Sequence, residues 1–137
     1  MDQETDLREL MRRTYEEIFP ADDETALHEV VAEDCVSHGD GGSEGVGFQA
    51  IAGTMHWLAK VFADRRWEIH RTAVDGDVAM MFCTFHGRHV GDLPGLPATG
   101  RLCAVKQVQI VRFRQGKGVE HWGVRDDAAM HRQLASA

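Results

Sequence analysis

The sequence lacks the features of membrane and secreted proteins. It contains no run of roughly eighteen apolar residues, so no membrane-spanning helix is expected. The N-terminal segment MDQETDLREL is acidic and polar, whereas a signal peptide begins with a basic segment followed by an apolar one. The three cysteines are widely spaced and form no CxxC pair, which argues against a disulfide framework or a zinc site. We therefore expect a cytoplasmic protein with buried, reduced thiols.

Positive charge is also scarce. The net charge is −7, and residues 1–34 alone hold twelve acidic and three basic side chains. A surface that binds nucleic acid needs clustered lysine and arginine, so no such partner is expected. The remaining residues carry ten acids and twelve bases and are rich in His, Gln, Met and Trp. That composition suits the wall of a small-molecule pocket.

The common cofactor and nucleophile motifs are missing. There is no P-loop, dinucleotide fingerprint, GxSxG or HExxH. The glycine-rich stretch GDGGSEG (39–45) does not follow a long strand in a βαβ unit, so it predicts a flexible loop. Nothing requires a cofactor or a metal. A cofactor-free pocket that contains histidines and a carboxylate suits proton-transfer chemistry.

Helical spacing dominates the first half of the chain and strand patterns the second. The predicted helices are 4–19, a short one capped by Asp22 and Asp23, and 46–63. The predicted strands are 34–39, 66–74, 78–90, 101–114 and 119–124, and a short helix over 126–135 closes the chain. Turns are expected at DGD (75–77) and QGKG (115–118), and a Pro/Gly loop at 91–100.

This order predicts one domain of the α+β class over residues 1–137. Three N-terminal helices would pack on a strongly curved antiparallel sheet, giving a cone-shaped barrel with an open mouth. Such a mouth is a natural place for a ligand pocket.

The stretch VEHWGVRDD (119–127) gathers the most chemistry in the chain. Strand alternation places His121 on one face and Trp122 on the other, and we expect His121 to face the pocket. Asp126 comes just before the final helix, where an aspartate either caps the helix or serves as a catalytic acid. Both interpretations stay open from the sequence.

Other polar side chains are candidates for the pocket wall. His86 and His89 lie three apart on a strand and would oppose each other unless Gly87 marks a bulge. Gln107 and Gln109 share a face that points either into the cone or to solvent.

Several motifs resemble a known family. They are SHG (37–39), VFAD (61–64), GRHVGDLPGLPATGR (87–101), IVRFRQGKGVEHWGVRD (110–126) and RQLA (132–135). Over roughly residues 5–135 the chain resembles the SnoaL-like polyketide cyclases, or ester cyclases, of the nuclear-transport-factor-two-like superfamily. The resemblance implies an α+β cone that dimerises through its sheet. It also implies an intramolecular aldol ring closure without metal or cofactor, in natural-product metabolism.

The chain departs from the family at one position. Related sequences often carry an acid directly after the Glu-His-Trp tryptophan, and that residue here is Gly123. If the family's base belongs there, either His121 or Asp126 has replaced it, or the chemistry differs. We therefore expect an enzyme of the cyclase, isomerase or lyase type that transfers protons on a carbonyl compound. The expected substrate contacts are His38, His86, His89, Gln107, Gln109 and Trp122.

Three alternatives remain. A hydrolase could activate water with a His and an Asp. A dimer could bind a small molecule in the same cavity without catalysis, and Gly123 favours that reading. A metal could be held by His38, His89 and His121, whose spread over three elements leaves the geometry open.

Overall fold

The computed structural model describes residues 2–38 and 44–135. Residues 39–43 of the predicted glycine-rich loop lie outside the described ranges. The helical elements are α1 (Gln3–Arg13), a π-helical turn η1 (Thr14–Ile18), α2 (Phe19–Ala21), α3 (Glu24–Val30), α4 (Phe48–Val61) and α5 (Asp127–Ala135). The strands are β1 (Val31–His38), β2 (Glu44–Val46), β3 (Phe62–Asp75), β4 (Val78–His89), β5 (Leu102–Arg114) and β6 (Lys117–Arg125).

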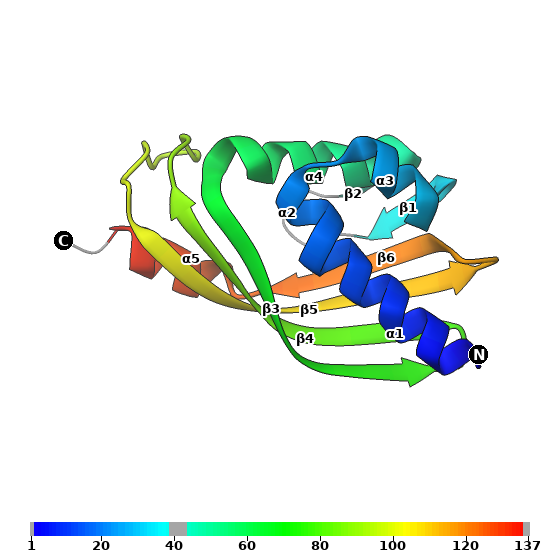
Figure 1. The fold of residues 1–137 in the computed structure, drawn as a ribbon. Helices are drawn as coiled ribbons and strands as arrows, with labels where there is room; N and C mark the ends of the chain where they lie inside the picture. Colours follow the sequence, from blue (N-terminus) through cyan, green and yellow to red (C-terminus); the bar gives the residue numbers. More distant parts are fainter. Residues whose placement is uncertain (1, 39–43, 136–137) are drawn as a thin grey trace.

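The strands form one open, curved sheet in the order β2-β1-β6-β5-β4-β3 (Figure 1). Helices α1 to α4 cover one face of this sheet, here called the inner face. The apolar core lies between them, with Leu27, Met55 and Val105 among its fully buried side chains. The opposite, outer face carries no helix of the described chain. The predicted α+β class and curved sheet are confirmed.

One pairing differs from the predicted antiparallel meander. Strands β3 to β6 are antiparallel neighbours, but β1 pairs with β6 in parallel, so the sheet is mixed. This parallel pair brings Ser37 opposite His121. A contact between residues so far apart in sequence leaves no local pattern that could predict it.

Two predicted boundaries also move. The third helix ends at Val61, and β3 starts at once at Phe62 rather than at Arg66. The register of β3 shifts between Ala63 and Arg66, and Asp64 takes a φ of 55°. The bulge breaks the alternation of buried and exposed residues that identifies a strand. The first residues of β3 were therefore assigned to the preceding helix in the sequence analysis.

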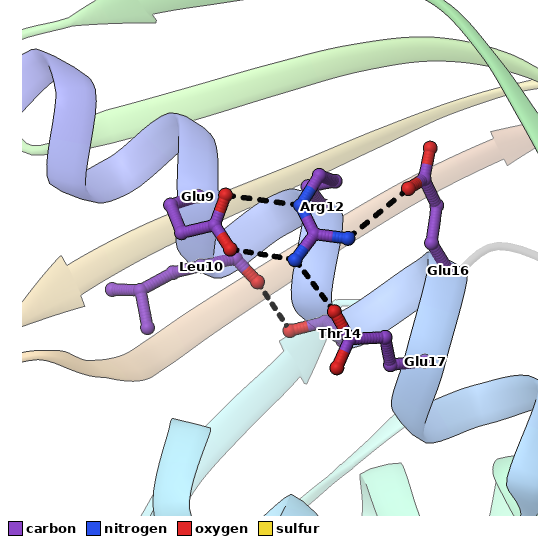
Figure 2. A network of polar contacts seen from close by, with 6 residues as sticks. All are labelled: Glu9, Leu10, Arg12, Thr14, Glu16 and Glu17. Carbon is purple, nitrogen blue, oxygen red and sulfur yellow. Dashed lines mark hydrogen bonds and ion pairs between the residues drawn. The ribbon is translucent and has the colours of Figure 1, made fainter.

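The first helix continues without a loop through η1 to α2. The first helix was predicted to end at residue 19, but Pro20 is tolerated in the first turn of α2. Figure 2 shows that Arg12, on the exposed side, bonds to Glu9 in α1 and to Glu16 and Glu17 in η1, and so connects the two segments. On the opposite side the π turn buries Tyr15 and Ile18 against the sheet. The turn therefore delivers a tyrosine hydroxyl to the interior.

Candidate active site

A cavity of about 310 Å³ opens between the helices and the inner face of the sheet. Most of its wall is apolar or aromatic: Phe19, Ile51, Trp57, Leu58, Trp67, Phe85, Leu93, Pro94 and Met130. Its polar side chains are Tyr15, Thr54, Gln107, Gln109, His121, Arg125, Asp127 and His131. This size and mixture are typical of a small-molecule site.

Several of the polar groups lie on one wall, which is formed by the paired strands β5 and β6. In their register Gln109 lies opposite Gly123, and Gln107 lies opposite Arg125. Alternation on β6 places His121, Gly123 and Arg125 on this same inner side. Both glutamines are buried and line the cavity, which decides the orientation that the sequence left open.

His121 sits at the centre of this wall within a chain of hydrogen bonds. Its Nε2 lies 2.7 Å from Gln109 Oε1, and its Nδ1 lies 3.3 Å from Ser37 Oγ. Gln109 Nε2 donates to Gln107 Oε1 over 3.0 Å, and the Tyr15 hydroxyl donates to Gln109 Oε1 over 3.4 Å. With Gln109 in this orientation, Nε2 of His121 carries the proton and Nδ1 accepts from Ser37.

These surroundings keep His121 neutral. Burial lowers the pKa of the imidazole to about 4, and the charges of Arg125 and His38 act in the same direction. Burial also raises the pKa of Tyr15 well above its ordinary value, so its hydroxyl stays a donor. His121 and Tyr15 thus offer neutral hydrogen-bonding groups at physiological pH, on a wall that also carries the charged Arg125.

Gly123 lines the cavity between His121 and Arg125 on β6. Its φ lies outside the left-handed region, so the backbone does not require glycine. A Cβ built there would lie 3.3 Å from Gln109 Oε1 and 3.4 Å from His121 Cε1. Any side chain at 123 would therefore project into the cavity beside His121.

Asp126, expected as a possible catalytic acid, lies outside the cavity lining. Its Oδ1 accepts from the Ala129 backbone N–H at 3.0 Å, so it caps α5. The capping interpretation is therefore confirmed, and the expected position of Asp126 at the pocket is not found. The next residue, Asp127, is the carboxylate that lines the cavity, with its Oδ1 3.6 Å from Arg125 Nε.

His38 and Trp122, expected as substrate contacts, lie away from the cavity. Their rings stack with centroids 5.2 Å apart, and His38 Nε2 lies 2.7 Å from Glu120 Oε2. Glu120 also accepts from Arg112 Nε at 2.9 Å. Strand parity explains the placement, because Glu120 and Trp122 alternate with the inward His121.

His86 and His89 do not share a face. The register between β4 and β5 runs unbroken past Gly87, so no bulge brings them together. His86 pairs with Glu68 at 2.8 Å on the outer side. His89 is fully buried, with Nδ1 accepting from the Thr99 backbone N–H at 3.2 Å. It fixes the loop after β4, and neither histidine lines the cavity.

Sequence reasoning missed five polar lining residues: Tyr15, Thr54, Arg125, Asp127 and His131. Tyr15 looked like one member of a helical apolar stripe, and its hydroxyl gave no local signal. Arg125 could have been found, because it shares strand parity with His121. Asp127 and His131 belong to α5, whose position at the cavity depends on the tertiary fold.

The described ranges contain no group of three His, Cys, Asp or Glu side chains arranged to hold a metal ion. His38, His89 and His121 in particular lie in three separate settings, so the three-histidine alternative lacks its geometry. Cys35, Cys83 and Cys103 are free and buried, as expected. No helix within residues 2–38 and 44–135 is long and apolar enough to cross a membrane.

Comparison with characterised proteins gives the family. The model of the SnoaL-like polyketide cyclases matches residues 9–134. The aklanonic acid methyl ester cyclase DauD of Streptomyces sp. (strain C5) is 31% identical over 115 residues, covering 81% of this chain and 68% of that protein. The nogalonic acid methyl ester cyclase of Streptomyces nogalater is 33% identical over 89 residues, covering 64% of this chain and 66% of that protein. The chain thus spans about two thirds of these relatives' length.

Solved structures share the fold over nearly the whole chain. TsrD from Streptomyces laurentii superposes with a TM-score of 0.87 at 24% identity, covering 100% of this chain and 99% of that one. Wild-type IdmH from Streptomyces antibioticus gives 0.82 at 26% identity, covering 93% and 97%. The named relatives are cyclases, which confirms the expected type of enzyme. The chain belongs to the SnoaL-like polyketide cyclase family.

Proposed function

We propose that this protein closes a ring in an aromatic polyketide by an intramolecular aldol reaction, without a cofactor, and that His121 transfers the proton. The cavity supports this proposal. Aromatic side chains such as Trp67 and Phe85 suit a flat ring system, while one polar wall suits oxygens along one edge of that system. Relatives act on aklanonic and nogalonic acid methyl esters, which we take as the substrate class.

The proposed step balances within one substrate molecule. The step needs the other tautomer, in which Nδ1–H donates to Ser37 Oγ and Nε2 has released Gln109. Nε2 then takes a proton from a carbon next to a carbonyl, and the enolate carbon attacks a second carbonyl. A carbon–carbon bond forms, the carbonyl π bond breaks, and the new alkoxide takes the proton back from the imidazolium. Tyr15, Gln107 and Gln109 line the cavity, and in this proposal Tyr15 O–H and the glutamine amides exchange their present partners to donate to the enolate oxygen.

Ser37 can support proton transfer by His121. Its hydroxyl can both donate and accept, so it can partner Nδ1 of His121 in either tautomer. The pKa of His121, about 4, makes the imidazole a weak base and its conjugate acid a strong one. The proposal therefore requires an acidic C–H, such as one between two carbonyls, and fast return of the proton.

The observation that carries the proposal is the 2.7 Å bond between His121 Nε2 and Gln109 Oε1 in an otherwise largely apolar cavity. To test it, the full chain is incubated with each methyl ester, and the isomeric product is resolved by chromatography. We expect His121→Ala to slow ring closure at least about 100-fold. His38→Ala, on the outer face, is the matched control and should stay within about twofold. Equal loss in both variants, or turnover unaffected by His121→Ala, would refute the role of His121.

A non-catalytic, ligand-binding role is the second candidate. Two observations favour it: Gly123 contributes no acid, and both ring nitrogens of His121 already have protein partners. Tight binding of both methyl esters with no ring closure by the wild type would select this function over the first.

We further propose that two copies pair through the outer face of the sheet. Exposed or half-buried apolar side chains lie there on β4, β5 and β6: Met80, Phe82, Val108, Ile110, Trp122 and Val124. Such a patch is typical of an interface. Light scattering of the wild type and of Phe82→Glu should give a dimer and a monomer, and a monomeric wild type would refute the pairing. A cytoplasmic location stays a prediction.

A further inference from the structure

The two glutamines of β5 are joined to each other through their amides. Gln109 Nε2 donates to Gln107 Oε1 over 3.0 Å, and both side chains are buried. An amide can turn by 180° about its last bond with almost no change of shape, so its hydrogen-bond partners decide which end points where. Gln107 provides the acceptor that keeps the NH2 end of Gln109 turned toward it.

The oxygen end of Gln109 faces His121 and Tyr15. Gln109 Oε1 lies 2.7 Å from His121 Nε2 and 3.4 Å from the Tyr15 hydroxyl. An amide oxygen only accepts hydrogen bonds, so Nε2 of the neutral imidazole carries the proton as long as this oxygen faces it. The tautomer of His121 therefore follows from the orientation of the Gln109 amide.

The same groups can also bond in the opposite sense. If both amides turn, Gln107 Nε2 donates to Gln109 Oε1, and Gln109 Nε2 donates to His121 Nε2. The imidazole then carries its proton on Nδ1, which lies 3.3 Å from Ser37 Oγ, and a hydroxyl oxygen can accept that proton. The Tyr15 hydroxyl can likewise accept from the turned amide. The chain is thus complete in two senses, and each sense corresponds to one tautomer of His121.

We propose that Gln107 is a positioning residue that sets the tautomer of His121 through the amide of Gln109. Glutamine suits position 107 because its amide accepts in one sense of the chain and donates in the other. A carboxylate would only accept, and an apolar side chain would do neither. The inference deepens the proposed function and rests on it for one point, that ring closure needs the Nδ1–H tautomer of His121.

The test reads the tautomer directly by NMR, without a substrate. Long-range proton–nitrogen correlation spectra of the full chain with isotope-labelled histidine, at neutral pH, show which ring nitrogen is protonated. The signals of His121 are those missing from His121→Ala. We expect Nε2–H to predominate in the wild type. Gln107→Met keeps the length of the side chain and removes the acceptor. The ratio of Nε2–H to Nδ1–H should then fall at least about fivefold, because a buried amide N–H without an acceptor is costly.

Gln107→Glu is the matched control. Its carboxylate still accepts from Gln109, so Nε2–H should stay predominant. Gln107→Leu also lacks an acceptor and replaces Gln107→Met if that variant does not fold. The inference would be overturned by a wild type with mostly Nδ1–H, by an unchanged ratio in the apolar variants, or by an equal shift in Gln107→Glu. The expected ratios in a wild type that closes no ring would instead contradict the proposed catalysis alone.

Discussion

On the inner face of the sheet His121 is surrounded by neutral partners, whereas on the outer face His38 and His86 each pair with a carboxylate. His121 bonds to Ser37 and Gln109, and its pKa is lowered to about 4, chiefly by burial. His38 lies 2.7 Å from Glu120 and His86 lies 2.8 Å from Glu68, both near solvent.

A third setting shows the opposite extreme. His56 bridges Glu24 and Asp22 on the helical side, and bonds to these two carboxylates raise its pKa. One residue type thus bridges carboxylates on the exterior and serves as a neutral hydrogen-bonding group inside. Burial and the charge of the neighbours decide which role a histidine takes.

The largest expected contrast is between two phenylalanines of β4. Phe85 is 1% exposed on the inner face, and Phe82 is 38% exposed on the outer face. We expect Phe85→Ala to lower the free energy of unfolding by about 3–5 kcal/mol, because it leaves a cavity among Phe62 and Trp67. Phe82→Ala should cost about 1 kcal/mol in urea unfolding. Equal costs would mean that the outer face is buried in an interface.

The lowered pKa of His121 should make the stability of the protein fall in acid. As pH falls below 6.5, its ordinary pKa, the unfolded chain takes up a proton that the folded imidazole refuses until pH is about 4. Its contribution to stability is therefore complete above pH 6.5 and is lost on acidification, by about 3 kcal/mol.

This loss can be isolated by comparing unfolding free energies at pH 7 and pH 4.5. We expect His121→Gln to lose less stability than the wild type over this interval. His38→Gln is the matched control and should follow the wild type. If His121→Gln also follows the wild type, His121 does not have the lowered pKa.

The smallest effect is expected at the outer cluster of His38, Arg112 and Glu120. Bonds to Arg112 and His38 lower the pKa of Glu120, but the cluster lies at the surface with Glu120 only half-buried, and solvent screens the attraction. Glu120→Gln should therefore move the midpoint of thermal unfolding by no more than about 2 °C. A fall of more than about 5 °C would show that the cluster is protected from solvent.

Local patterns were enough for much of this architecture. The period of the apolar residues predicted helices before strands, and the turns at 75–77 and 115–118 were placed correctly. Alternation along β6 correctly separated His121 from Trp122. These features depend on backbone geometry within a few residues, so the sequence carries them directly.

The site needed contacts that no local pattern records. Only the packed fold decides that Gln107 and Gln109 point inward. From the sequence, the strand face that carries these two polar side chains could point either to the cavity or to solvent. Likewise α5 turns Asp127 toward the cavity while Asp126 caps the helix.

The sequence by itself determined the family, the order of the elements and the glycine at position 123. The tertiary structure alone decided which histidine lines the cavity, which aspartate reaches it, and that a tyrosine from the first helical segment joins them. The reason is physical: periodicity is written over a few neighbouring residues, whereas burial and charge depend on segments brought together from across the chain.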